Sequence, residues 1–284
     1  MRAEPVRMWR GRAPATPLPG AARPAPRKLP LVIGLVLLMP FAAAALLTGL
    51  LAPYDPMASV AAPFQPPSLS HPFGTDDLGR DLLSAIIAGA RTSLTAGLAV
   101  AALSALIGTA VGVTAGFVGG WTDDLLMRLT EVVQVVPRFF VAILVAGLFG
   151  GSLTNLILVL GLMSWPGLAR IVRAEALSLR AREFVQAAVA LGGGPLWVIR
   201  RHVLPNAVRP ILATLSLIVA GAILTEAGLS YLGLSDPNVV SWGRLIENAQ
   251  AFLYRAWWLS VFPGLAIVLA IVAVTQVIDG LRRE

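Results

Sequence analysis

The chain has 284 residues but no cysteine, a single lysine and only two histidines. Without cysteine it can form neither a disulfide bond nor a thiolate metal site. The lysine, Lys28, stands between Arg27 and Leu29, so the chain lacks the Gly-Lys-Ser/Thr sequence of a phosphate-binding loop. The histidines, His71 and His202, are far apart in sequence and give no metal-site pattern. Any transport or mechanical work would therefore draw its energy from another subunit or from an ion gradient.

The sequence patterns of common enzymes and ligand sites are missing as well. There is no H-E-x-x-H metalloprotease motif and no G-x-S-x-G nucleophile elbow. The glycines Gly192-Gly193-Gly194 have the wrong spacing for a dinucleotide loop, and Asp76, Asp77 and Asp81 have the wrong spacing for a calcium loop. We therefore expect no catalytic residue, no cofactor and no metal site.

Charged residues are also scarce, at 13% of the chain against about a quarter in soluble domains. Hydrophobic residues make up 57%, and the mean hydropathy is +0.78. A helix needs about 20 apolar residues to cross a bilayer. Uncharged runs approaching or exceeding this length recur at 29–54, 92–122, 139–169, 210–225 and 256–278. The composition predicts an all-α polytopic membrane protein.

The net charge of +7 does not indicate a nucleic-acid partner, because the basic residues lie in loops and tails between apolar runs. We expect a lipid bilayer as the surroundings of the chain and no nucleic acid. The first 29 residues form a basic, proline-rich tail that is predicted to be disordered.

Six transmembrane helices are predicted, the third of them interrupted at Pro137-Arg138. Residues 30–90 would form the first helix and a proline-rich segment outside the membrane, with a short helix from Thr75, its expected N-cap, to about Ala88. Residues 91–284 would form the main transmembrane domain. The six predicted spans are 31–51, 93–116, 125–149, 153–169, 206–228 and 257–279.

Arginine and lysine indicate the orientation of these spans. The loops and tails on one side carry 17 basic residues, whereas 53–91, 148–154 and 229–256 on the other side carry 4. Because basic loops remain in the cytoplasm, both termini are predicted to be cytoplasmic. An aromatic belt is expected at the opposite interface, formed by Tyr231, Trp242, Tyr254, Trp257 and Trp258.

Glycine recurs every fourth residue in the second span, at Gly108, Gly112, Gly116 and Gly120. This spacing places the glycines on one helix face, where they would let another helix approach closely. The alternative is that they are glycines of the kind that membrane helices commonly contain, with no specific partner.

The polar segment 170–209 between the fourth and fifth spans is expected to be cytoplasmic. The fourth helix should continue through about residue 180, and a short helix should follow Arg182 and end at Gly192-Gly193-Gly194. Pro195 suits the first turn of a second short helix. Leu204-Pro205-Asn206 is then expected to turn the chain into the fifth span.

These two short helices would form a compact knob with a narrow tip at Ala187 and Ala188, suited to enter a groove on a cytoplasmic partner. The run Gln186-Ala187-Ala188, then Gly192, then Leu204-Pro205 resembles the EAA signature of ABC importer permeases, with the same spacing. Two positions differ, because Gln186 replaces the glutamate of the signature and His202 replaces its isoleucine. An ion pair made by that glutamate would here become a neutral hydrogen bond.

Further segments are similar to the C-type permease of the dipeptide, oligopeptide and nickel group of importers, and together they cover about residues 30–284. These segments are His71–Asp81, Ser164–Gly167, Glu226–Leu234, Ser241–Gly243 and Phe262–Leu265.

The resemblance implies a type I ABC importer transmembrane fold in the cytoplasmic membrane of a bacterium or archaeon. It implies that the chain itself is not an enzyme and that it works with a homologous second permease, two cytoplasmic ATPases and an extracytoplasmic solute-binding protein. Peptides are the favoured substrate class, with nickel chelates and glutathione-like solutes left open. Coupling to the ATPases would fall within about 180–205, at Glu183, Phe184, Gln186, Ala187, Ala188, Gly192, Leu204 and Pro205.

Two charges inside the predicted spans, Arg138 and Glu226, are further candidates for a gate or for the substrate path. For Arg138 the alternative is pairing with a backbone carbonyl or a partner helix, and for Glu226 it is a structural role near the interface. The competing function is an ion-coupled secondary transporter or channel that needs no ATPase.

Overall fold

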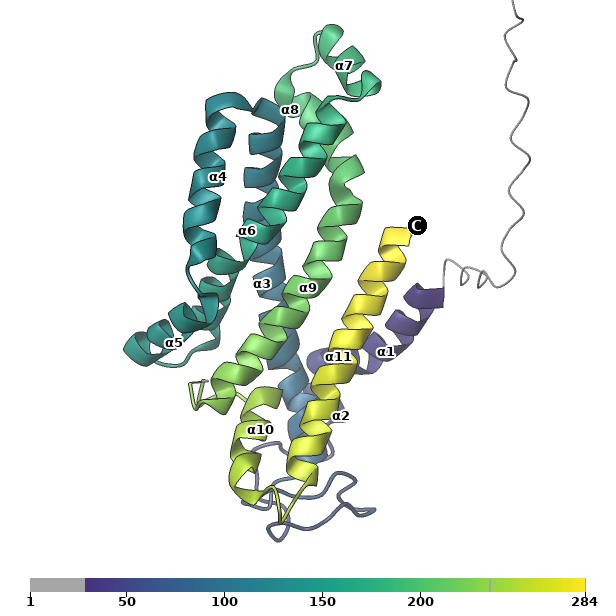
Figure 1. Ribbon diagram of the computed structural model, residues 1–284. Helices are drawn as coiled ribbons and strands as arrows, with labels where there is room; N and C mark the ends of the chain where they lie inside the picture. Colours follow the sequence, from purple (N-terminus) through teal and green to yellow (C-terminus); the bar gives the residue numbers. More distant parts are fainter. Residues whose placement is uncertain (1–28, 235, 284) are drawn as a thin grey trace, which may run out of the picture.

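The computed structural model describes residues 29–234 and 236–283, and this part of the chain is almost entirely helical (Figure 1). The predicted tail, residues 1–29, lies outside the described residues except for Leu29. The helices are α1 (Leu29–Leu46), α2 (Thr48–Leu51), α3 (Leu82–Val118), α4 (Gly120–Val135), α5 (Arg138–Phe149), α6 (Leu153–Arg180), α7 (Glu183–Ala190), α8 (Pro195–Val198), η1 (Ile199–Val203), α9 (Leu204–Tyr231), α10 (Trp242–Ala249), η2 (Gln250–Phe252) and α11 (Trp258–Arg283).

Five apolar helices in the described chain are long enough to cross a membrane, and α4 with α5 makes a sixth, broken span. The axis of α5 is bent by 67° from the axis of α4 at the break. The break falls where the sequence predicts it, because Pro137 has no N–H for the helix ladder and the residue before a proline avoids helical geometry. The described chain therefore has the six predicted spans when the bent pair α4–α5 is counted as one.

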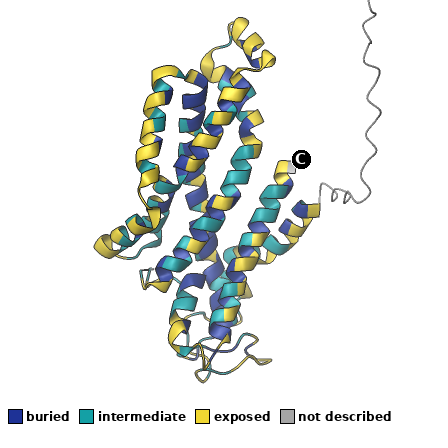
Figure 2. Cartoon of the chain, viewed as in Figure 1, coloured by how far each residue is buried: buried dark blue, intermediate teal, exposed yellow. Residues whose placement is uncertain are grey.

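The centre of the bundle is α3, a largely buried helix (Figure 2). It packs along α6 through its glycines. A Cβ atom added to Gly108 would lie 2.9 Å from the carbonyl oxygen of Trp165, and one added to Gly116 would lie 2.5 Å from that of Arg173. At Gly112 the added atom would overlap the carbonyl oxygen of Ala169. The three glycines therefore face the backbone of α6, which no larger residue would allow at this separation.

The helix expected from Thr75 to about Ala88 begins later than predicted, so the predicted start at Thr75 is wrong. Residues 75–81 form a loop, and α3 begins only at Leu82, with Asp81 as the N-cap that accepts a hydrogen bond from the Ser84 amide at 2.9 Å. Thr75 is fully buried instead, because its hydroxyl accepts from the Gln65 amide and donates to the Ala62 carbonyl, both at 2.8 Å. The second span is one helix of 37 residues.

Two members of the expected aromatic belt are buried. Trp242 has no exposed surface and donates its indole N–H to the Ile86 carbonyl at 2.9 Å, and Trp258 donates to the Thr75 carbonyl at 3.3 Å. Both therefore fasten α10 and α11 to the segment around the start of α3. Tyr231, Tyr254 and Trp257 are exposed.

The expected turn at Leu204-Pro205-Asn206 is also wrong, because the helix continues from Pro195 to Tyr231. The chain passes Pro205 through the single π-helical turn η1, which precedes it. A proline cannot donate to the helix ladder, and a turn with wider hydrogen-bond spacing absorbs that missing donor.

Candidate functional site: the knob between α6 and α9

The knob consists of α7, α8 and the connecting loop Leu191–Gly194, and it projects beyond the ends of α3 and α6 (Figure 1). Helix α7 follows directly on Arg182 and carries an acidic residue, Glu183, in its first turn, where the positive end of the helix dipole favours it. Pro195 opens α8 at its first turn, as the sequence predicts.

Helix α7 ends in a paired hydrogen-bond motif that depends on Gly192. The Gly193 amide donates to the Ala188 carbonyl and the Gly192 amide to the Val189 carbonyl, both at 3.0 Å. This is the Schellman arrangement, which needs a residue in the left-handed conformation at the end of the helix. Gly192 supplies it with a φ of +88°, and a Cβ atom added to it would meet nothing within 4 Å. Backbone conformation alone therefore selects glycine at this position.

One face of α7 is buried against the rest of the bundle. Val185 and Ala188 are 1% and 9% exposed, and they belong to a small hydrophobic cluster separate from the main core. This cluster joins the knob to the end of α3, to α6 and to the start of α9 through Phe117, Ala176, Leu179, Val198, Val203 and Ala207. The apolar contact fixes the knob to three long helices at once.

The other face of α7 is free in the subunit. Glu183, Phe184, Gln186 and Ala187 are exposed, and the only side-chain hydrogen bond of Gln186 in the described chain is a weak one to the Ala181 carbonyl, at 3.4 Å. The two alanines therefore differ, because Ala187 faces outward and Ala188 packs inward. Of the remaining candidate residues, Leu204 is half-buried and Pro205 exposed, both at the start of α9.

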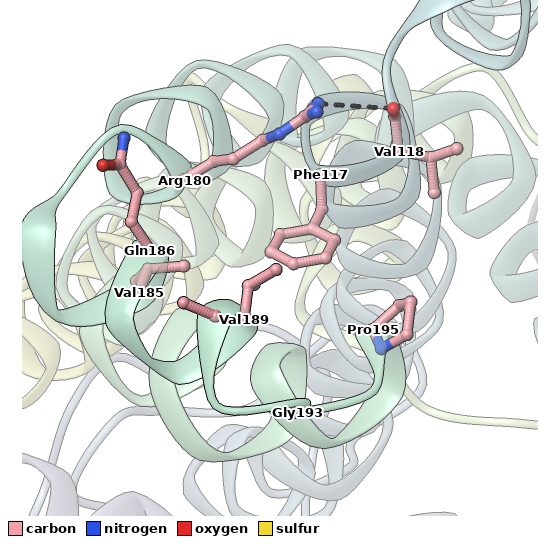
Figure 3. Close-up of a pocket in the computed structure, with 9 residues that line it drawn as sticks. Phe117, Val118, Arg180, Val185, Gln186, Val189, Gly193 and Pro195 are labelled. Carbon is pink, nitrogen blue, oxygen red and sulfur yellow. Dashed lines mark hydrogen bonds between the residues drawn. The ribbon is translucent and has the colours of Figure 1, made fainter.

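A cavity of about 640 Å³ lies between α7 and the end of α3 (Figure 3). Val185 and Val189 point toward the Phe117 ring, whereas the Gln186 amide points away from it. At the rim of this cavity, the Arg180 guanidinium donates a hydrogen bond to the Val118 carbonyl at 3.3 Å. The knob thus stands over a partly apolar hollow, with its polar residues on the rim.

Sequence reasoning missed the aromatic contacts that hold the base of the knob. The His202 ring lies 5.2 Å from the Trp197 ring and 6.0 Å from the Phe184 ring, measured between centroids. Its Nε2 atom is buried without a hydrogen-bond partner in the described chain. The departure of His202 from the EAA pattern is the signal that pointed to this position.

Glu226 and Arg138, the two intramembrane candidates, form no ion pair with each other. The Glu226 carboxylate is buried and accepts hydrogen bonds from Ser230 at 2.9 Å and from Ser93 of α3 at 3.4 Å. Arg138 is exposed at the start of α5, with its guanidinium beside Gly221 of α9. Glu226 is thus enclosed between helices, whereas Arg138 is open on the surface of the subunit.

No group of three or more histidine, aspartate or glutamate side chains in residues 29–234 and 236–283 is arranged to hold a metal ion. The site consists of an exposed helical face on a firmly packed base.

The chain matches known proteins over most of its length. The chain is 41% identical over 269 residues, 94% of its length, to a protein of Brucella suis named as a putative peptide transport system permease, of which it covers 90%. It is 34% identical to the dipeptide transport system permease protein DppC of Alkalihalophilus pseudofirmus, over 88% of the chain and 83% of that protein.

A solved structure has the same fold. A chain of the methionine ABC transporter MetNI in an inward-facing conformation superposes with a TM-score of 0.61, covering 71% of this chain and 96% of that one, at 15% sequence identity. The family described as binding-protein-dependent transport system inner membrane component matches residues 108–283. The chain belongs to this family of transport-system membrane components.

Proposed function

We propose that the chain is the membrane-spanning, non-catalytic permease subunit of an ATP-driven ABC importer for di- or oligopeptides. The observation that carries the proposal is the knob, because its exposed face bears the EAA-type residues while its other face is fixed to the ends of three long helices. The names of the relatives from Brucella suis and Alkalihalophilus pseudofirmus support peptides as the substrate class.

The knob would act as the docking element for a cytoplasmic ATPase. Glu183, Phe184, Gln186 and Ala187 would contact that subunit, while Gly192 sets the angle between α7 and α8. When ATP closes the two ATPases, the displaced knob would carry the ends of α3 and α6 with it. The close glycine contacts between those helices would make them move as one body, which suits the rigid-body rearrangement of alternating access.

The proposal includes a location and partners. The 17 basic residues on the side of the knob support a cytoplasmic position for the knob and both termini, in the inner membrane of a bacterium or archaeon. The partners would be a homologous second permease, two ATPases and an extracytoplasmic solute-binding protein. The helix α10 and the loop before α3 would then lie on the side of the binding protein.

The test is affinity purification of the tagged chain from native membranes in mild detergent, with mass spectrometry of the proteins that stay bound. Recovery of a homologous permease and two ATPases is expected. A parallel purification of an established importer serves as the control for the detergent. Recovery of this chain alone, while the control complex stays intact, would contradict the proposal and favour a self-contained, ion-coupled transporter.

A further inference from the structure

Helix α4 carries exposed polar residues at helical spacing, in a segment that belongs to a membrane span. Glu131 is exposed, as are Arg128 and Gln134, three residues on either side of it, and Arg138 follows at the bend into α5. Residues spaced by three or four are neighbours on a helix surface. Arg128, Glu131 and Gln134 therefore share one polar face of α4, beside the exposed apolar residues Leu129, Val132 and Val135, and Arg138 lies past the 67° bend.

The rotation of α4 about its axis is fixed by the residues it buries. Asp123 and Thr130 are the buried residues of α4, and Asp123 is bonded to Arg173 of α6. Since α4 packs against α3 and α6, the polar face lies on the part of α4 that these helices do not cover.

Lipid is an unsuitable neighbour for this face. At about 1.5 Å per residue, Glu131 lies about 12 Å along the helix from Asp123, whose partner Arg173 belongs to the segment expected in the cytoplasm, and Arg138 lies deeper, past the bend. Charged side chains inside membrane spans face water-filled cavities or other protein rather than lipid tails. Water or a second protein must therefore cover the face.

A permanent interface with another protein is also an unsuitable environment for this polar face. Arg128, Glu131 and Arg138 take part in none of the ion pairs of the described chain, although their signs alternate. A fixed interface would have to supply an opposite charge for each of these residues, whereas a water-filled path leaves them solvated. The Arg138 side chain also extends to α9. Its guanidinium is the group nearest to Gly221 of that helix, which has no side chain to block the approach.

We propose that Arg128, Glu131, Gln134 and Arg138 line the aqueous path of the transporter and bind the charged ends of a zwitterionic peptide in transit. Arg138, at the start of α5 and beside Gly221 of α9, contacts the peptide carboxylate, and Glu131 contacts its ammonium group. This complementary pair favours a solute with both charges over one with either end blocked. The inference rests on the proposed importer function and deepens it.

The first test uses the absence of cysteine from this chain. In the assembled transporter in proteoliposomes, Gln134→Cys and Glu131→Cys are treated with a membrane-impermeant, sulfonated maleimide, and labelling of this chain is measured. Both variants are expected to react at least tenfold faster than Val36→Cys, a control at an exposed apolar position of α1. Reaction no faster than the control would place the face in lipid or in a sealed interface and would overturn the proposal.

The second test measures ATP-dependent uptake of radiolabelled tri-alanine, tri-alanine amide and N-acetyl-tri-alanine with one and the same binding protein. Because the binding protein is unchanged, a change in preference between variants originates in the permease. Arg138→Gln is expected to reduce the preference for the free carboxylate over the amide on the order of tenfold, and Glu131→Gln to do the same for the free amine over the acetylated peptide. Arg170→Gln, an exposed arginine of α6, should leave both preferences unchanged.

The outcomes separate this proposal from the proposed function. If the wild-type complex imports none of the three peptides, peptide import itself is wrong, and with it the inference. If wild type imports them and the variants keep its preferences, the importer function stands and the binding role is wrong. If Arg138→Gln or Glu131→Gln no longer copurifies with the second permease while the isolated subunit stays folded, the face is a subunit interface, which also overturns the proposal.

Discussion

Arg173 of α6 holds Asp123 of α4 with two hydrogen bonds, from Nε to Oδ1 at 2.5 Å and from a terminal guanidinium nitrogen to Oδ2 at 2.6 Å. This two-pronged contact matches the planar guanidinium to the carboxylate, which lysine cannot reproduce. Asp123 is mostly buried, and Arg173 is the residue whose backbone Gly116 of α3 approaches. One arginine therefore joins α3, α4 and α6 near the knob.

Replacing Asp123 with asparagine should destabilise the subunit by about 1–2 kcal/mol, because the partly exposed Arg173 loses its charged partner. The change should appear as a lower midpoint of thermal unfolding in detergent. The exposed neighbour Asp124 provides the matched control, and Asp124→Asn should have little effect. An equal loss in both variants would mean that net charge, and not the Arg173 contact, is responsible.

Placing a side chain on the glycine face of α3 should separate α3 from α6. Gly112→Val should lower the free energy of unfolding by about 1–3 kcal/mol or prevent accumulation of the protein, because the new atoms overlap the backbone at Ala169. Unfolding in detergent and the yield of monodisperse protein measure the effect. Gly167→Ala in α6 is the control, since its Cβ would meet nothing within 4 Å, and stability as low as that of Gly112→Val would contradict the packing argument.

Changing Gly192 to isoleucine should uncouple ATP hydrolysis from uptake. A left-handed conformation costs a non-glycine residue about 1–2 kcal/mol, so the hydrogen bonds that close α7 would be lost and the angle to α8 would change. The measured quantity is the number of solute molecules imported per ATP hydrolysed.

The matched control for Gly192 is Gly194→Ile. Gly194 has equally open surroundings but a φ of −66°, which any residue adopts. Equal coupling ratios in the two variants would show that the left-handed turn is not needed for coupling.

Restoring the acidic residue of the EAA signature, in Gln186→Glu, should leave coupling intact or improve it. Gln186 is exposed and weakly bonded within the subunit, so the change creates no unpaired buried charge, and a charge-assisted bond to the ATPase becomes possible. ATPase stimulation by loaded binding protein in proteoliposomes gives the comparison, with Gln186→Ala as the variant that removes the polar group. Failure of Gln186→Glu to assemble would show that this site differs from the family pattern.

The features that the sequence predicts correctly are those governed by local physical rules. Apolar length predicts the spans, Pro137 predicts the break in the third, and the glycine run predicts the end of α7. The features it misses depend on distant partners. The sequence around Thr75 does not indicate that its hydroxyl donates a hydrogen bond to the Ala62 carbonyl across the loop. The sequence around Trp242 likewise does not show that its indole N–H donates to a carbonyl of α3.

The polar face of α4 escapes sequence reasoning for a related reason. Single charges within an apolar span are visible in the sequence, and Arg138 is identified in this way. Arg128 and Glu131, however, lie close enough to the start of α4 to resemble interfacial residues. Their common orientation becomes evident only when Asp123 is seen bonded to α6, because that contact fixes which side of α4 remains uncovered.

The helix from Pro195 to Tyr231, which passes Pro205 without a turn, is 37 residues long, or about 55 Å at 1.5 Å per residue. It begins in the knob and ends beside α10, so the two ends of the molecule share a single rod. If this rod pivots as one piece, a tilt of about 5° about one end moves the other by about 5 Å. Contact with the solute-binding protein on the α10 side and ATP-driven motion of the knob would then both move this one helix. The two events would be coupled through the helix itself, without a series of separate side-chain contacts.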